Sequence, residues 1–211
     1  MERKNKFISI VAIGNFNPAI LKPHFLSEKC GFKSESQPKG RTTPVVSEVV
    51  FDNITFLMDL ERFQITERHP ADFKETKTIK IMKKYLEVLS YTPVYTMGSN
   101  FNIEIINESE KIVQNLNDKN YLLEALKTEE LIYSSKIKYS KESILCLSWE
   151  LLKKGDNISQ IAINLKKNIF TINYNTEIRD IYENNTKKNF FNENHDNINL
   201  EFEAFLKSLF L

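Results

Sequence analysis

The sequence predicts an α+β protein in which antiparallel sheets carry helices packed on one face. In the first half, strand-like runs between Val45 and Thr66 lead into an amphipathic helix at Pro70–Leu89. The same order returns in the last third, where strand-like runs between Leu131 and Asn175 precede a second amphipathic helix at Asn199–Leu211. Runs of strands followed by helices are typical of α+β folds. The chain therefore predicts two similar halves, each with strands followed by a helix.

Length and composition favour one compact body. The 211 residues are 41% hydrophobic and 11% aromatic, which is enough to bury a real core. We expect an N-terminal α+β half at residues 1–107, a helical connector at 108–130, and a C-terminal β-meander with a helix at 131–211.

The beginning of the chain predicts a strand, a short helix and a loop. The apolar run before Gly14 is short for a signal-peptide core and lacks a small-residue cleavage site after it, so it predicts a strand. Asn17 followed by Pro18 predicts a helix start, and Pro23 limits that helix to a turn or two within Ala19–Leu26. The polar stretch Ser27–Thr43 predicts an exposed loop.

A hairpin, a helix and a long strand are predicted next. Val45–Phe51 and Ile54–Leu60 flank Asp52-Asn53, two residues that tolerate the positive φ of a tight turn, and Phe63–Thr66 adds a third strand. Pro70–Leu89 begins with proline and early acids, and its apolar residues recur at helical spacing. Val94–Ile106 predicts a strand in which Gly98 marks a bulge or the close approach of another backbone.

The second half repeats this pattern after a polar, helix-prone connector with its clearest helical turn at Tyr121–Leu126. The asparagine-rich stretch Asp180–Asn197 predicts irregular structure before the last helix. The four predicted strands are Leu131–Tyr139, Ser143–Leu152, Ile158–Leu165 and Ile169–Asn175.

Charge and cysteine content exclude several classes of protein. The 29 basic and 28 acidic residues nearly cancel, so no global field attracts nucleic acid or an anionic membrane. Cys30 and Cys146 are too few for a disulfide framework, which favours free thiols in a reducing, cytoplasmic setting. No apolar stretch approaches the length of a membrane-spanning helix, and we expect no membrane partner.

The sequence contains no recognisable set of catalytic residues. His24, His69 and His195 lack companions at metal-ligand spacing, and five glycines are few for a nucleotide-binding loop, so we expect no metal and no cofactor. Asp59 and Glu61 on one strand face have the spacing of a carboxylate cluster, although a solvated sheet edge before a turn is the simpler explanation. Glu193-Asn194-His195-Asp196 predicts a polar loop that caps the last helix.

The best candidate binding surface is the lysine-rich side of the Pro70–Leu89 helix. Cations at helical spacing can meet several phosphates or an acidic partner, whereas the simpler interpretation is a solvated helix face. The residues of this lysine surface are Lys74, Lys77, Lys80 and Lys84.

The turn and strand-end motifs of the first half resemble those of a sporadically distributed family of uncharacterised prokaryotic proteins. The resemblance rests on Asn15-Phe16-Asn17-Pro18, on Asp59-Leu60-Glu61-Arg62-Phe63, and on Thr92-Pro93-Val94 with Gly98 and Asn100. It implies no activity and no catalytic residues, and the scattered occurrence of the family implies a mobile-element or defence context.

These observations predict a non-enzymatic protein that binds another macromolecule. The leading interpretation is a homodimer or a subunit of a bacterial assembly, since long strands and phenylalanine-rich helices offer surfaces for pairing. A nucleic-acid-associated module that uses the lysine surface is the first alternative. An enzyme whose carboxylates converge only in the fold is the second. No small-molecule partner is predicted.

Overall fold

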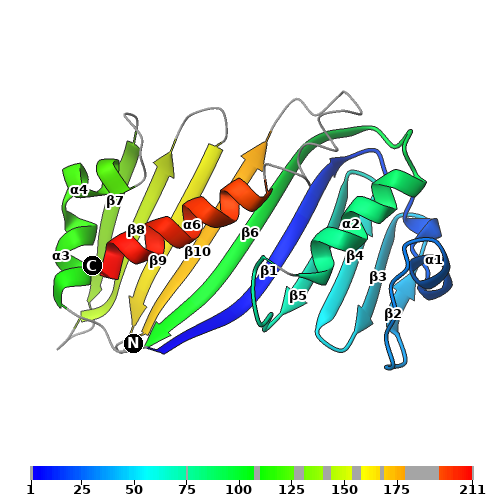
Figure 1. Ribbon diagram of the computed structural model, residues 1–211, viewed down its shortest axis with the longest axis horizontal. Helices are drawn as coiled ribbons and strands as arrows, with labels where there is room; N and C mark the ends of the chain where they lie inside the picture. The colour runs from blue at the N-terminus through cyan, green and yellow to red at the C-terminus, as the bar shows by residue number, and fades with distance from the viewer. Residues whose placement is uncertain are drawn as a thin grey trace.

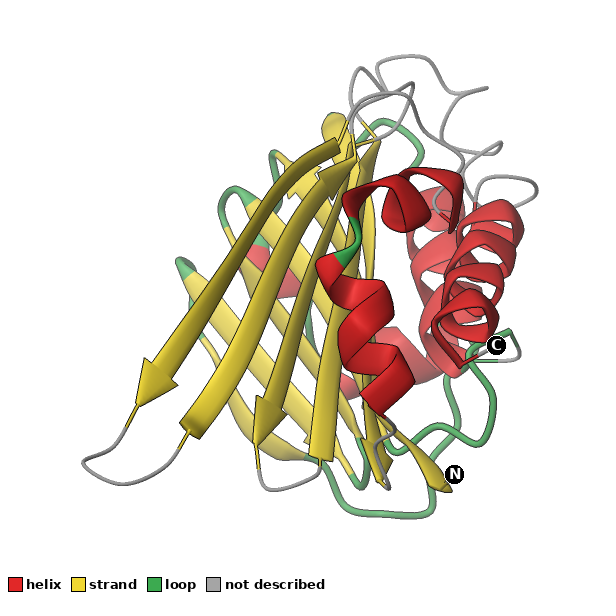
Figure 2. Ribbon diagram, turned by 90° about the vertical axis from the view of Figure 1, so that its left-hand side faces the viewer, coloured by secondary structure: helices red, strands yellow, loops and turns green. Residues whose placement is uncertain are grey.

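The computed structural model describes residues 2–74, 76–106, 110–125, 131–139, 144–153, 158–166, 169–178 and 195–210. Their strands form one ten-stranded sheet whose neighbours all pair in antiparallel order. The helices lie on one side of this sheet, as Figure 2 shows. The predicted α+β class, with an antiparallel sheet and helices on one face, is confirmed.

Two long strands form the centre of the sheet. β1 (Glu2–Gly14) pairs with β6 (Val94–Ile106), and four strands continue the sheet on either side (Figure 1). Beyond β1 the order is β5 (Arg62–Arg68), β4 (Ile54–Asp59), β3 (Val46–Phe51) and β2 (Lys39–Thr42). Beyond β6 it is β10 (Ile169–Ile178), β9 (Ile158–Lys166), β8 (Ile144–Lys153) and β7 (Leu131–Tyr139).

The two sides of the sheet repeat one plan. Each begins with a central strand, continues through short helices to the outer edge, returns strand by strand to the centre, and ends in a helix. In the first half the helices are η1 (Pro18–Ile20), α1 (Pro23–Glu28) and α2 (Lys77–Val88). In the second half they are α3 (Glu110–Asn117), α4 (Lys119–Ala125) and α6 (His195–Phe210).

An aromatic cluster joins the two halves beneath the helices. Phe101 of β6 stacks on Phe202 of α6 with ring centroids 5.3 Å apart, and Phe73 meets the Phe101 ring edge-on at 5.2 Å. Tyr174 of β10 packs against Phe202 at 5.1 Å. All four side chains are buried. Because Phe73 precedes α2 while Phe202 belongs to α6, this cluster ties the helix layer of both halves to the central strands.

Alternation along the strands separates the helix-covered face from the other face. Along β6, the buried residues Phe101, Ile103 and Ile105 alternate with half-buried Asn102 and Glu104. A period of two places successive side chains on opposite faces, so the apolar set lies under the helices and the polar set on the uncovered face.

Helix α2 begins seven residues later than Pro70–Leu89 predicts. Thr76 is extended, with φ −79° and ψ 149°, and the buried Glu67 carboxylate accepts the backbone N–H of Lys77 at 2.9 Å. A carboxylate ten residues upstream therefore takes the capping role that the sequence suggested for Pro70 and its neighbours. Pro70 and Phe73 belong to a non-helical segment that crosses toward α6.

Two other predictions in the first half need correction. Asn17 caps a single turn, η1, through its Oδ1, and Pro23 starts α1 instead of ending a helix. Proline suits the first helical position because its missing N–H has no partner there in any case. The predicted loop Ser27–Thr43 contains the edge strand β2, whose Lys-Gly-Arg-Thr sequence has no apolar alternation.

The remaining strand predictions are confirmed closely. Asp52, with φ 41°, and Asn53 form the turn between β3 and β4, and β6 has the predicted bounds. A Cβ at Gly98 would lie 2.7 Å from the Thr176 carbonyl oxygen, which confirms the close approach of another backbone. The last helix begins at His195, within the predicted irregular stretch, and positions 180–194 lie outside the described residues.

Candidate binding surfaces

The lysine surface is divided between a helix and the segment before it. Lys77, Lys80 and Lys84 are exposed along α2 at spacings of three and four residues, which places them on one side of the helix. Lys74 is also exposed but precedes the helix. Lys84 pairs with Glu87 at 3.2 Å, whereas Lys74, Lys77 and Lys80 have no ion pair with any described residue.

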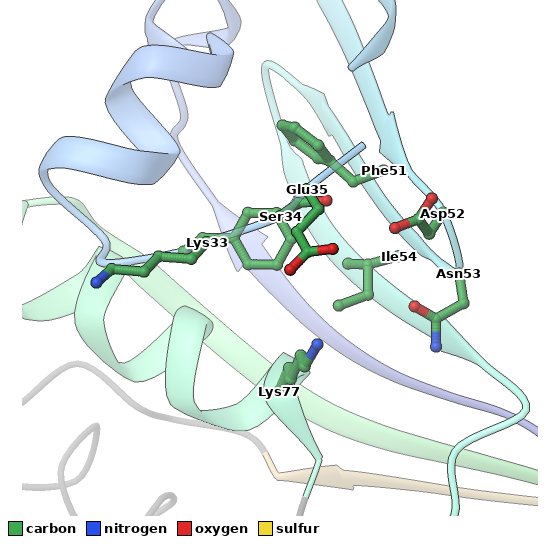
Figure 3. Close-up of a pocket in the computed structure, with 9 residues that line it drawn as sticks. Lys33, Ser34, Glu35, Phe51, Asp52, Asn53, Ile54 and Lys77 are labelled. Carbon is green, nitrogen blue, oxygen red and sulfur yellow. The ribbon is translucent and has the colours of Figure 1, made fainter. Parts of the chain in front are cut away.

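A shallow hollow of about 500 Å³ lies beside Lys77. Figure 3 shows Lys77 pointing into this hollow toward Glu35, while the Lys33 side chain extends away from it. Asp52 and Asn53 form the opposite side. Two lysines and two carboxylates are among the residues that line the hollow, so their formal charges sum to zero.

A second hollow of about 570 Å³ lies between β1, the segment before α2, and α6. We call it the α6 hollow. Arg3 donates two hydrogen bonds to the Glu203 carboxylate at 2.7 and 2.8 Å, and its guanidinium lies 5.6 Å from the centre of the Phe73 ring. Asn5 donates to the Pro70 carbonyl at 3.1 Å. Its lining residues are Arg3, Asn5, Ala71, Asp72, Lys74, Asn199, Leu200, Glu203 and Lys207.

Exposed apolar side chains gather at one end of the first half, which we call the apolar end. Its members come from five separate positions: Ile13, Val45, Leu60, Val88 and Tyr91. Tyr91 is 96% exposed, Val45 61% and Leu60 52%. In the part of the chain with described side chains, the other exposed large apolar residue is Leu200.

The backbone holds the segments of the apolar end together. Gly14 donates its N–H to the Glu61 carbonyl at 2.8 Å, and Phe16 donates to the Leu60 carbonyl at 2.9 Å. Asn15 donates to the Pro93 carbonyl at 2.9 Å. The end of β1 and the start of β6, in the upper part of Figure 1, therefore meet the turn between β4 and β5. Val45 joins them because Val46 pairs with Asp59.

Asp59 and Glu61, the carboxylate pair predicted from the sequence, do not share a strand face. The Asp59 carboxylate accepts the backbone N–H groups of Glu61 and Arg62 at 2.8 and 2.7 Å. Asp59 therefore shapes the turn, and Glu61 lies in that turn instead of on a strand face. Among the described residues, no group of three His, Cys, Asp or Glu side chains could hold a metal ion.

The uncovered face of the sheet carries a patch of amide side chains. Asn100 and Asn102 of β6 lie opposite Asn175 and Asn173 of β10. Ser9 of β1, the cross-strand neighbour of Asn100, is fully buried. The buried Ser9 Oγ, Asn100 Oδ1 and Asn173 Oδ1 have no hydrogen-bond partner among the described residues. Polar groups on this face are typical of an antiparallel sheet that meets water on one side.

The groups with raised pKa values lie in the core. Burial raises the pKa of the Cys30 thiol to about 11, although the nearby Lys84 ammonium opposes the shift. Burial likewise raises the pKa of Tyr174 to about 12 and that of Tyr85 further. These groups remain neutral at physiological pH, and a neutral thiol is a poor nucleophile.

Comparison with known proteins assigns no family. No family model matches the chain, and no curated protein matches it. Twelve chains of solved structures match, among them a rolling circle replication initiator protein from Geobacillus stearothermophilus. That protein is 9% identical, the match covers 89% of this chain and 77% of that chain, and the TM-score is 0.38. No helix in the described part of the chain has the length and hydropathy needed to cross a bilayer.

Sequence patterns indicated only part of these surfaces. They placed Lys77, Lys80 and Lys84 on the exposed side of a helix, where the structure has them. They missed the apolar end, because its residues are isolated in the sequence and each belongs to a different segment. Val45 and Leu60 continue the buried positions of β3 and β4 in the alternation of the hairpin, so the sequence pattern favours their burial. They are exposed because they lie just beyond the ends of the two strands.

Proposed function

We propose that this protein works by binding a second copy of itself through the apolar end. The observation that carries the proposal is the concentration of exposed apolar residues at one end of the sheet. Exposed apolar residues that gather in one region of a surface are typical of interaction sites. Tyr91 is almost completely exposed, and tyrosine is one of the residue types enriched among the strongest contributors to interfaces.

The charges beside the apolar end suit a two-fold interface. Glu61 and Arg62 are both exposed, and neither forms an ion pair with a described residue, although Arg62 donates to Gln64. In a two-fold dimer the same patch serves both copies, so Glu61 of one copy can meet Arg62 of the other. Adjacent opposite charges are therefore self-complementary across the axis.

The first test is the change Leu60→Asp. A carboxylate at the centre of an apolar interface loses its hydration without gaining a partner, so we expect the dimer dissociation constant to rise at least about 30-fold, the equivalent of ~2 kcal/mol. Sedimentation equilibrium over a hundredfold range of protein concentration measures this constant. The matched control is Leu200→Asp, which places the same charge at an exposed leucine outside the apolar end. A wild-type protein that stays monomeric at the highest concentration would refute the proposal.

Nucleic-acid binding is the second candidate function. The observation that favours it is the absence of ion pairs to Lys74, Lys77 and Lys80 among the described residues, which leaves three exposed ammonium groups for phosphates. Phosphate contacts by lysine release counterions from DNA, and they make binding depend steeply on salt.

This candidate predicts a separate result for the lysine surface. Each of Lys74→Gln, Lys77→Gln and Lys80→Gln is expected to reduce the slope of log K against log salt by about 1, because one phosphate contact is lost. Fluorescence anisotropy with a labelled duplex at several salt concentrations gives the slope. Lys84→Gln is the control with a smaller expected change, because Glu87 already neutralises Lys84. Equal slopes for all four variants and the wild type would exclude these contacts.

A further inference from the structure

The α6 hollow has the chemistry of a small-molecule site. Its volume of about 570 Å³ falls within the range of ligand pockets, ~300–1,000 Å³. Asn199, Glu203 and Lys207 line it at intervals of four residues, so one face of α6 forms a wall. At a rise of 1.5 Å per residue this wall extends for about 12 Å, which is the length of a nucleotide-sized molecule.

The cations of the hollow divide into one paired group and two available groups. Arg3 is held by the bidentate contact with Glu203, which fixes both side chains and neutralises their charges. Lys74 and Lys207 also line the hollow, and neither forms an ion pair with any described residue. They belong to different segments: Lys74 to the segment before α2, and Lys207 to α6. Asp72 also lines the hollow, and its carboxylate accepts the backbone N–H of Lys74 at 2.9 Å, so the two unpaired lysines exceed it by one positive charge. Two ammonium groups in one lining are suited to a phosphate, which presents several acceptor oxygens.

One residue of the lining, Asn199, has a buried acceptor without a donor in the described part of the chain. Asn199 is 6% exposed, and its Oδ1 is buried with no hydrogen-bond partner among the described residues. A buried carbonyl oxygen without a partner costs free energy, and an unsatisfied group of this kind calls for an explanation. The asparagine χ2 torsion is soft, so a modest rotation turns this oxygen toward the hollow. A ligand hydroxyl or amino group there would satisfy it.

An apolar contact completes the site. Leu200 is 65% exposed at the rim of the hollow, next to Asn199. A planar or apolar group of a ligand can cover the Leu200 side chain and remove it from water. The lining therefore offers cations for phosphate, a carbonyl acceptor for a hydroxyl or amino donor, and an apolar surface for a ring.

From this combination we propose that the α6 hollow binds a phosphorylated small molecule that carries hydroxyl groups, of the nucleoside monophosphate class. Lys74 and Lys207 bind the phosphate, Asn199 accepts from a ligand donor, and Leu200 packs against the base. The site does not include any residue of the apolar end. It shares Lys74 with the duplex contacts proposed above, whereas Asn199, Leu200 and Lys207 belong to the hollow alone.

Calorimetric titration of the full chain with AMP, adenosine and inorganic phosphate tests the site. We expect saturable binding of AMP and at least about tenfold weaker binding of the other two probes, because each lacks one set of contacts. Lys74→Gln and Lys207→Gln should each weaken AMP binding about tenfold, as expected for loss of a charge-assisted contact. Lys80→Gln changes an exposed lysine outside the hollow and should leave AMP binding unchanged.

Asn199→Leu separates a binding role from a structural one. The change removes a buried, unpaired carbonyl in favour of an apolar side chain of similar size, so the melting temperature should hold or rise. AMP binding should nevertheless weaken about tenfold, because the ligand donor loses its acceptor. The proposal is overturned if AMP shows no saturable binding, if inorganic phosphate binds as tightly as AMP, or if Asn199→Leu binds AMP as well as the wild type does.

Discussion

Replacing Phe101 with alanine is expected to lower the free energy of unfolding by about 3–5 kcal/mol, the usual cost of deleting a buried aromatic ring. Phe101 is fully buried and contacts rings from three other segments: Phe73 before α2, Tyr174 on β10 and Phe202 on α6. The surrounding strands are hydrogen-bonded on both sides, so they cannot close around the space left behind. Urea unfolding followed by circular dichroism measures the loss.

Tyr91→Ala is the matched control for Phe101→Ala. It also deletes an aromatic ring, but one that is almost completely exposed in the single chain. At protein concentrations well below the dimer dissociation constant, its effect on the free energy of unfolding should therefore stay within about 0.5 kcal/mol. A loss below ~1 kcal/mol for Phe101→Ala would contradict the central role of the aromatic cluster. Unchanged m-values in both variants are needed for the comparison, because a change in m indicates an altered unfolded or native state.

The strands of this fold could be predicted wherever one face is apolar. Val94–Ile106 alternates along its length because one face meets the helices and the other does not, and its predicted bounds are those of β6. The turn at Asp52-Asn53 could be predicted because only a few residue types accept its backbone geometry. β2 was missed since an edge strand of Lys-Gly-Arg-Thr buries nothing, and its pairing with β3 is its main contact.

Features that depend on distant segments could not be predicted in the same way. The start of α2 is set by the Glu67 carboxylate of β5, which accepts the backbone N–H of Lys77. Pro70 and Asp72 predicted a helix start that is wrong, because proline and acidic residues are typical of a first helical turn. In the fold, tertiary contacts keep this segment non-helical. The α6 hollow likewise combines Arg3 with Glu203, residues at opposite ends of the chain that only the sheet brings together.

The central pair of strands links this architecture to the proposed binding surface. β1 and β6 each begin one half of the repeated plan, and Ile13 of the apolar end lies near their junction. At that junction the register shifts between Ile13 and Gly14, and Gly14 pairs with Val94. The geometry of the apolar end therefore depends on how closely the two backbones approach at Gly14.

Gly14→Ala is expected to destabilise the protein by about 3 kcal/mol, the upper end of the range for overpacking. A Cβ at this position would lie 2.0 Å from the Pro93 carbonyl oxygen, a backbone atom that cannot move aside as a flexible side chain can. Relief requires separating β1 from the start of β6, which breaks the hydrogen bond from Asn15 to Pro93. The same shift should weaken self-association through the apolar end. Thermal unfolding and sedimentation equilibrium measure the two effects.

Gly31→Ala distinguishes this steric effect from the general cost of replacing glycine. Gly31 has φ +67°, and nothing lies within 4 Å of a Cβ built there, so alanine meets backbone strain of about 1 kcal/mol but no collision. It should lower stability less than Gly14→Ala and leave the dimer dissociation constant unchanged. Equal losses of stability at both glycines would indicate that the two backbones at Gly14 can separate at little cost. A dimer dissociation constant unaffected by Gly14→Ala would place the interface away from the end of β1.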